Sequence, residues 1–150
     1  SLDEIAVIFA HEVGHHVHRH IRKMILFGGL YSLIGFYLCD FMMRLWLSDA
    51  GVGVGSVDYA NLPVFVLPVL LLTIHLFSML LEPLQNGLSR HFERQADRFA
   101  LDATQNRDAY LSAFSKLAKQ NKDDPSPHRL EVFLFHSHPP IAERIAMARN

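Results

Sequence analysis

The chain has 150 residues, of which half are hydrophobic and 19% are charged, and its formal net charge is -1. This length suits a single domain over residues 1–150, and the apolar fraction is high for a water-soluble domain. The near-neutral charge excludes a typical nucleic-acid surface, so we expect no nucleic-acid partner. The single cysteine excludes an internal disulfide and a zinc site built from several thiolates. Because the chain opens with serine rather than methionine, we expect it to be a fragment of a longer protein.

The first predicted element is a helix over residues 2–22. Ser1 and Glu4 fit a capping box, Asp3 adds negative charge to the first turn, and no proline interrupts the stretch. Its apolar residues favour a largely buried element. These residues are Ile5, Val7, Ile8, Phe9 and Val13.

Two apolar stretches follow, which we predict to be transmembrane helices at about 24–47 and 62–82. The run from Leu62 to Leu81 holds 20 uncharged residues. As a helix it would be about 30 Å long, which is the thickness of a bilayer's hydrocarbon core. Two buried helices of a soluble protein are the alternative, because the first run is short and prolines interrupt the second. Between them, the glycine-rich connection 48–61 is expected to lie outside the membrane.

Basic residues flank the outer ends of both stretches, and the connection between the stretches has none. This asymmetry predicts a multi-pass integral membrane protein whose active site is on the cytoplasmic side. Arg44, near the other end of the first stretch, counts against this orientation. The flanking basic residues are Arg19, Arg22, Lys23, Arg90 and Arg94.

The rest of the chain is also predicted to be helical, which gives a mainly α fold. Prolines, glycines and polar clusters set the boundaries of these elements. We expect helices at 84–103, 108–120 and 141–148, a loop at 121–127 and a short apolar segment at 130–135.

The strongest chemical signal is the sequence from His11 to His15, HEVGH. Residues four apart project from the same face of a helix, so both imidazoles can bind one metal ion. Glu12, beside them, could act as the base that activates a water molecule. The metzincin arrangement would supply a third histidine at position 21, which is Ile21 here. The third ligand must therefore come from another part of the chain.

Glu93 is the predicted third ligand. It belongs to a polar stripe with Asn86, Arg90 and Asp97 on the helix after the second apolar stretch, and such a stripe beside a membrane needs water, cations or a metal. A solvated helix face balanced by arginines is the alternative. Asp97, one turn further, could accept the outward N–H of a ligating histidine, or could simply pair with Arg90 or Arg94. We assign Asn86 to the same supporting set.

The two predicted spans explain how these residues could meet. A transmembrane hairpin returns the chain to the side on which it started, so the His11–His15 helix and the Glu93 helix would lie on the same side of the membrane. The expected architecture is therefore a helical integral-membrane metallopeptidase core, with a zinc site between two helices that the hairpin joins.

The motifs resemble those of the CAAX prenyl protease family, integral-membrane zinc metallopeptidases of the gluzincin type that are related to HtpX. The resemblance covers nearly the whole chain, including the two spans. The matching segments are Ala10–His15 with His20 beyond, Pro83–Ala100, Ser137–Pro140 and Glu143–Ile145.

The resemblance implies one Zn²⁺ per chain, bound by His11, His15 and Glu93, with Glu12 as the base. His138 would line the site and stabilise the oxyanion, although a histidine before two prolines can also be a plain loop residue. Arg144 would help to organise this segment. His16 and His136 depart from the usual family pattern, and further transmembrane helices are expected upstream.

The implied function is that of a zinc-dependent endopeptidase of membrane-associated substrates. Its partners would be a peptide or protein substrate, possibly prenylated, and membrane lipid. An HtpX-like protease that removes damaged membrane proteins is one alternative. A catalytically inactive zinc-binding membrane protein is the other.

Overall fold

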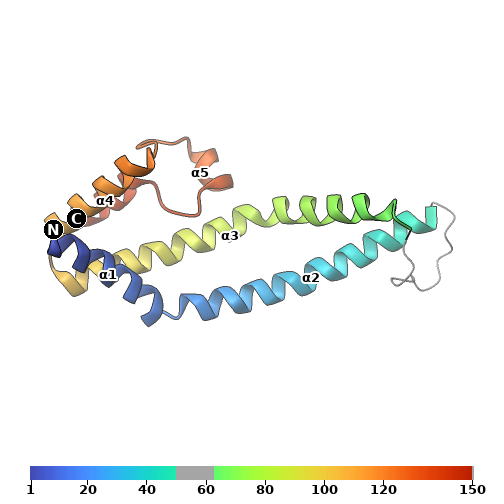
Figure 1. The fold of residues 1–150 in the computed structure, drawn as a ribbon, viewed down its shortest axis with the longest axis horizontal. Coiled ribbons are helices and arrows are strands. Elements are labelled where there is room, and N and C mark those ends of the chain that lie inside the picture. The colour runs from blue at the N-terminus through green and yellow to red at the C-terminus, as the bar shows by residue number, and fades with distance from the viewer. Residues whose placement is uncertain (50–62, 150) are drawn as a thin grey trace. The chain divides into compact units, whose positions relative to one another are not determined.

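The computed structural model describes residues 1–49 and 63–149, and its regular elements are all helices within these ranges (Figure 1). The mainly α prediction is confirmed. Residues 50–62 lie outside the described residues. They include most of the predicted connection 48–61 and the first residue of the predicted second span. The helices are α1 (Leu2–Val17), α2 (His20–Asp49), α3 (Val66–Thr104), α4 (Arg107–Asn121), α5 (Arg129–Phe135) and α6 (Ile141–Arg149).

The chain forms two compact units. The first consists of Ser1–Lys23 and Glu82–Asn150, and the second of Met24–Leu81. Helices α2 and α3 each contribute to both units. Every predicted site residue belongs to the first unit.

The second unit is an apolar helical hairpin. Gly35 of α2 makes room for Phe77 of α3, because a Cβ atom at position 35 would lie 2.6 Å from Cε1 of that ring. Met43 and Val66 are buried between the same two helices. Most other apolar side chains of this unit are exposed, and Leu26 and Leu80 are 77% and 75% accessible.

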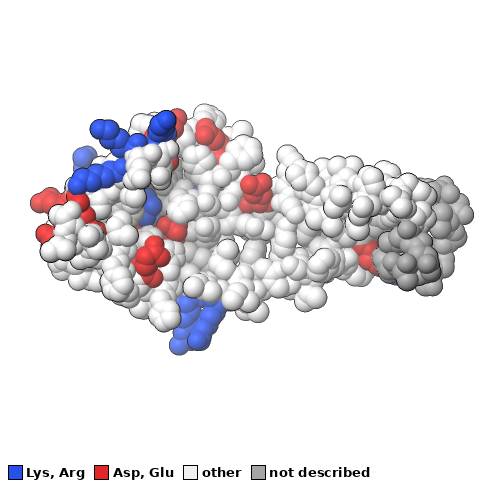
Figure 2. Space-filling model, viewed as in Figure 1, with Lys and Arg blue, Asp and Glu red and all other residues white. Residues whose placement is uncertain are grey.

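This exposure argues against two buried helices of a soluble protein. Both α2, over His20–Trp46, and α3 are long and apolar enough to cross a membrane, and only 11% and 6% of their most apolar windows are buried. On the face seen in Figure 2, charged side chains gather over the first unit, and the described residues of the hairpin show few charges. A large exposed apolar surface of this kind is typical of lipid contact.

Helix α1 ends earlier than the sequence predicts. The capping box of Ser1 and Glu4 is present, but the helix stops at Val17, and Arg19 adopts a left-handed conformation with φ of 56°. The expected single helix over 2–22 is therefore wrong beyond Val17. No glycine or proline marks the break, so local sequence gives no warning of it. Ile5 and Phe9 were expected to be buried but are 64% and 68% exposed, because α1 packs through one face.

Helix α3 is longer than expected. A separate helix over 84–103 was predicted to begin after Pro83, but Pro83 lies inside a continuous helix of 39 residues. Proline removes one backbone hydrogen bond and disfavours the preceding turn. A long helix in an apolar setting tolerates this loss, because an unfolded backbone there would leave many more groups without partners. A single helix consequently carries both an apolar stretch and Glu93.

The core of the first unit forms where α4 packs against α1 and α6. Val7, Tyr110, Phe114 and Ala148 are buried together there. Helices α1 and α3 also approach closely, because Gly14 has no side chain. A Cβ atom at Gly14 would lie 3.1 Å from Cα of Ala96. This close approach brings the histidines of α1 within reach of Glu93.

Candidate metal centre

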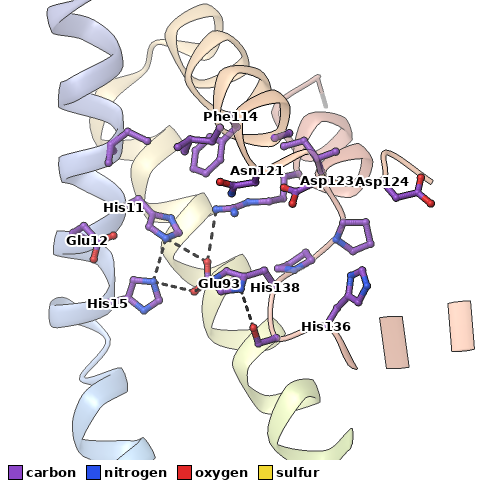
Figure 3. Close-up of a pocket in the computed structure, with 18 of the residues that line it drawn as sticks. His11, Glu12, His15, Glu93, Phe114, Asn121, Asp123, Asp124, His136 and His138 are labelled. Atoms are coloured by element: carbon purple, nitrogen blue, oxygen red, sulfur yellow. Dashed lines mark hydrogen bonds and ion pairs between the residues drawn. The ribbon is translucent and has the colours of Figure 1, made fainter. Parts of the chain in front are cut away.

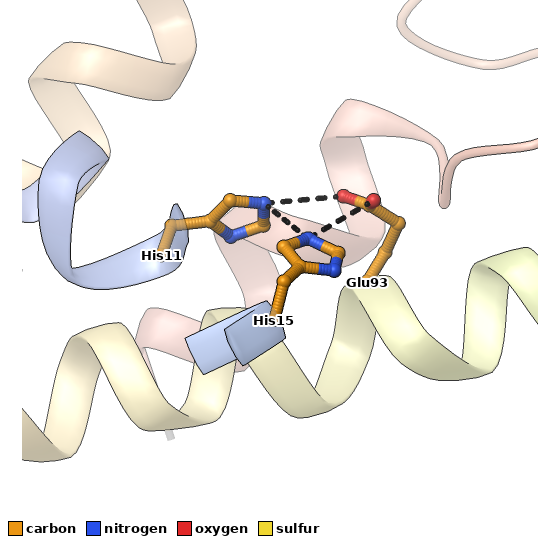
Figure 4. Close-up of side chains that lie close together, drawn as sticks. All are labelled: His11, His15 and Glu93. Atoms are coloured by element: carbon orange, nitrogen blue, oxygen red, sulfur yellow. Dashed lines mark hydrogen bonds and ion pairs between the residues drawn. The ribbon is translucent and has the colours of Figure 1, made fainter. Parts of the chain in front are cut away.

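Three potential metal ligands converge from two helices. His11 and His15 project from α1, and Glu93 projects from α3 towards them (Figure 4). The two Nε2 atoms lie 3.2 Å apart. Oε2 of Glu93 is 3.4 Å from Nε2 of His11, and Oε1 is 3.4 Å from Nε2 of His15.

These separations fit a tetrahedral zinc ion. Bonds of about 2.0–2.1 Å to such an ion place neighbouring donor atoms about 3.3–3.4 Å apart. The Nε2–Nε2 distance of 3.2 Å is close to this spacing, and each Nε2 atom has a different carboxylate oxygen of Glu93 at 3.4 Å. Two imidazoles and one carboxylate are also the donor set of zinc sites that keep one position open. The residues present therefore fit the metal that the motif predicts.

Asp97 supports His11 from behind. Its Oδ1 atom lies 2.9 Å from Nδ1 of His11, which is an ion-pair distance, although the ring N–H deviates from a linear hydrogen bond. An acceptor at this position fixes the proton on Nδ1 and leaves Nε2 free for a metal. The structure thus places Asp97 against a predicted ligand. Arg90 and Arg94, the alternative partners predicted for Asp97, contact other groups. Arg94 pairs with Glu143, and Arg90 donates to backbone carbonyl groups.

Arg144 of α6 holds Asp97 in place. Its Nε atom donates to Oδ2 of Asp97 at 2.8 Å, and a terminal nitrogen donates to Oδ1 at 2.6 Å. The guanidinium also stacks over Phe114, with 4.0 Å between Cζ and the ring centroid. Asp97 is fully buried, so this two-point contact compensates a carboxylate that is removed from water.

Charges around the centre shift its pKa values in opposite directions. Burial opposes protonation of His11, but the carboxylates of Asp97 and Glu93 outweigh it and raise the pKa of His11 to about 9. Burial lowers the pKa of His15, and the neighbouring His11 lowers it further. Burial opposes ionisation of Glu93, but His11, His138 and Arg144 hold the pKa of Glu93 below its ordinary value. The metal-free centre therefore keeps His11 in its charged form at neutral pH, with a proton on each ring nitrogen.

Metal binding should consequently tighten as the pH rises from about 6.5 to about 9. His11, whose pKa is about 9, must lose the proton on Nε2 before that atom can bind a metal. The other ring proton, on Nδ1, remains directed at Asp97. Each pH unit below that value weakens the apparent affinity about tenfold. Competition against a chelator of known pH dependence measures this slope. An affinity that stays constant over the range contradicts the prediction.

The metal-free protein should show the opposite trend. A raised pKa contributes stability that is fully present below 6.5, the ordinary value of histidine, and is lost as the pH rises to about 9. Unfolding midpoints of metal-free and metal-loaded protein should therefore diverge as the pH increases.

A pocket of about 700 Å³ opens onto the centre (Figure 3). The two histidines of α1 line one side, His136 and His138 line the other, and Glu93 lies between them. Glu12 is exposed and lines the same pocket next to His11. The predicted base and the predicted ligands thus share one cavity.

His138 reaches the centre from the segment before α6. Its Nε2 atom lies 3.6 Å from Oε1 of Glu93, and its Nδ1 atom lies 2.9 Å from Oγ of Ser137. The side chain is 63% exposed, so a ligand in the pocket could contact it directly.

Two polar residues of α3 anchor this segment. Nδ2 of Asn86 donates to the carbonyl of Leu134 at 2.8 Å. Arg90 donates to the carbonyl groups of Val132 and His136. Asn86 therefore contacts the chain that leads to His138 and not a ligand. Both side chains are buried, so the polar stripe on α3 is not a solvated face.

From the sequence, His20 is interpreted only as a surface or supporting residue, four positions after His16, and Gln95 is not singled out. His20 is only 2% exposed and contacts the predicted ligand His15. Its position in the resembling motif was the only signal, because a spacing of five residues does not place two side chains together on a continuous helix.

Comparisons with known proteins indicate a metallopeptidase family. The chain matches peptidase family M48 over residues 1–150. It is 35% identical over 98% of its length to the uncharacterized metalloprotease YhfN of Bacillus subtilis. It is 30% identical over 99% of its length to the CAAX prenyl protease 1 homolog of Mus musculus, and 26% identical over 99% to the protease HtpX homolog of Streptococcus uberis.

The chain spans 34%, 30% and 54% of the lengths of these three relatives, respectively. The predicted kinship with the CAAX prenyl protease family and HtpX is confirmed. From its match along the entire length, the chain belongs to peptidase family M48.

Proposed function

We propose that this chain is the catalytic part of a membrane-embedded zinc endopeptidase. The observation that carries the proposal is the convergence of His11, His15 and Glu93, whose donor atoms lie within 4.8 Å of one another, in a pocket that Glu12 and His138 also line. The two apolar stretches lie between His15 and Glu93 in the sequence. A chance cluster of residues so far apart is a poor explanation.

The residues divide the work of peptide hydrolysis. Zinc, when bound by the three ligands, would polarise the scissile carbonyl and make a water molecule more acidic. Glu12 takes a proton from the attacking water and passes it to the leaving amine nitrogen. His138 donates a hydrogen bond from Nε2–H to the carbonyl oxygen as negative charge develops on it. Asp97 and Arg144 keep His11 in a fixed orientation throughout.

The pocket suits an extended peptide with apolar groups. Its walls carry Ile8, Phe114, Leu117, Phe135 and Ile141. We propose substrates that are membrane-associated or prenylated, since an apolar wall would accept a hydrophobic side chain or a lipid group. Two features support this class: the apolar hairpin, and a relative whose name describes it as a CAAX prenyl protease.

The same features support a location within the membrane. We propose that α2 and the apolar part of α3 both cross the bilayer, as in a multi-pass protein. The basic residues that flank these helices support a cytoplasmic active site, because basic flanks stay on the cytoplasmic side. Lipid is then a constant partner of the hairpin.

Removing the metal from the full-length protein should abolish peptide cleavage. Dialysis against a chelator is expected to reduce hydrolysis to background, and one equivalent of Zn²⁺ should restore it. Magnesium serves as the control ion, because it prefers oxygen ligands in octahedral geometry. A farnesylated peptide and its unmodified counterpart, compared in the restored sample, separate a prenyl-dependent enzyme from a general membrane protease. Hydrolysis that survives metal removal would refute the proposed mechanism.

A further inference from the structure

His20 lies against the predicted ligand His15, although the two are five residues apart. On an unbroken helix, residues at this spacing point about 140° away from each other. The chain breaks after α1, and the left-handed Arg19 turns α2 so that Nδ1 of His20 lies 3.0 Å from Nδ1 of His15. This conformation is energetically costly for a non-glycine residue. Contacts on either side of the turn must offset that cost.

The proposed metal site determines which of the two histidines donates this hydrogen bond. Nε2 of His15 faces Glu93 and His11, so this atom must keep its lone pair for a metal. The single proton of the neutral ring is then on Nδ1. Because two ring nitrogens in contact need one donor and one acceptor, His15 donates and Nδ1 of His20 accepts.

Gln95 and His91 extend this series of hydrogen bonds beyond His20. The proton of neutral His20 is on Nε2, which lies 2.9 Å from Oε1 of Gln95, a carbonyl oxygen that accepts. The amide nitrogen of Gln95 in turn lies 3.2 Å from Nε2 of His91. Each donor from His15 to His91 therefore meets an acceptor. No contact in the series brings two N–H groups face to face.

Stacking fixes the ring of His20. It lies nearly parallel to the ring of Phe92, with centroids 4.3 Å apart and an interplanar angle of 13°. His18 stacks on it with centroids 5.5 Å apart and an angle of 15°. A ring that is 2% exposed and held between two others cannot rotate freely.

We propose that His20 is a positioning residue for the metal ligand His15, and that Gln95 sets the orientation of His20. The inference rests on the proposed zinc centre. The two histidine ligands are then supported by different chemistry: a carboxylate backs His11, whereas a neutral imidazole and an amide back His15. The support for His15 adds no charge to the centre.

Variants of the full-length protein in detergent test this assignment. The readouts are the zinc dissociation constant, from chelator competition, and the visible spectrum after Co²⁺ substitution. His20→Phe keeps an aromatic ring on Phe92 but removes both nitrogens, and is expected to weaken zinc binding about ten- to a hundredfold and to shift the Co²⁺ bands. His20→Asn offers an oxygen near the position of Nδ1 and should recover most of the affinity. His16→Phe is the matched control, because His16 is an exposed histidine on α1.

Gln95 provides an independent pair of variants. Gln95→Leu leaves Nε2–H of His20 without an acceptor and should weaken zinc binding several-fold. Gln95→Glu keeps the acceptor and should retain the affinity. This pair decides the question if His20→Phe fails to fold, which circular dichroism reveals.

The outcomes separate the two proposals. Wild-type protein that binds no zinc overturns the centre itself and the role of His20 with it. Wild-type protein that binds zinc, together with His20→Phe of equal affinity and an unchanged Co²⁺ spectrum, overturns only the role of His20. Equal losses in His20→Phe and His20→Asn also overturn it, because a purely structural role predicts no rescue by the amide.

Discussion

Replacing Glu12 with glutamine is expected to lower kcat by about a thousandfold or more and to leave zinc binding intact. Proton transfer by a positioned side chain contributes about 10²–10⁴ to the rate, and an amide of the same size cannot accept the proton. Glu12 is exposed in the pocket and contributes no ligand atom to the group formed by His11, His15 and Glu93. The substitution should therefore remove the base and spare the metal centre.

The measurement pairs peptide hydrolysis with metal analysis of the same sample. Glu93→Gln is the matched comparison, because the same chemical change at a ligand should lower zinc content as well as activity. Stoichiometric zinc without turnover in Glu12→Gln supports the assignment. Glu12→Gln that retains turnover would assign the base to another group.

Replacing Arg144 with methionine should destabilise the metal-free protein by about 3–5 kcal/mol. Asp97 is fully buried and takes two hydrogen bonds from the guanidinium, and removing one partner of a buried ion pair leaves an uncompensated charge. For a domain of this size the loss corresponds to about 10 °C in the apparent unfolding midpoint. Zinc must be absent during the measurement, because bound metal would stabilise the folded state and mask the effect.

Arg94→Met is the control on the same pair of helices. Arg94 pairs with Glu143 of α6, but both side chains are substantially exposed, at 37% and 47%. An exposed pair of this kind contributes about 0–1 kcal/mol. Similar losses for the two methionine variants would refute the special role of Asp97 and Arg144. In the double variant Asp97→Asn with Arg144→Met, the loss should be smaller than the sum of the two single losses.

Local geometry made part of the centre predictable. The spacing of His11 and His15 places two imidazoles on one face of any helix, whatever the rest of the fold does. Glu93 could be proposed because a polar stripe with two carboxylates beside an apolar stretch is costly unless it meets water, cations or a metal. Both signals depend only on helical periodicity, and helices are what the chain forms. For the same reason the mainly α fold could be predicted.

The features that the sequence did not reveal depend on tertiary contacts. The left-handed turn at Arg19 follows no glycine or proline signal, and it is held by contacts of His20 with residues far away in sequence. The continuity of α3 through Pro83 contradicts the local rule for proline, because backbone groups in an apolar setting favour an unbroken helix. The partners of Asn86 and Arg90 are backbone carbonyls, which carry no residue-specific pattern.

The order of the ligands along the chain has a consequence for how the protein is made. His11 and His15 precede both apolar stretches, whereas Glu93 follows them. During synthesis the histidine pair is therefore made first, and Glu93 is added only after the hairpin has been synthesised. If the proposed centre binds zinc, tight capture of the ion should therefore be a late event in biogenesis, and a chain arrested between the two stretches should lack the proposed hydrolytic centre.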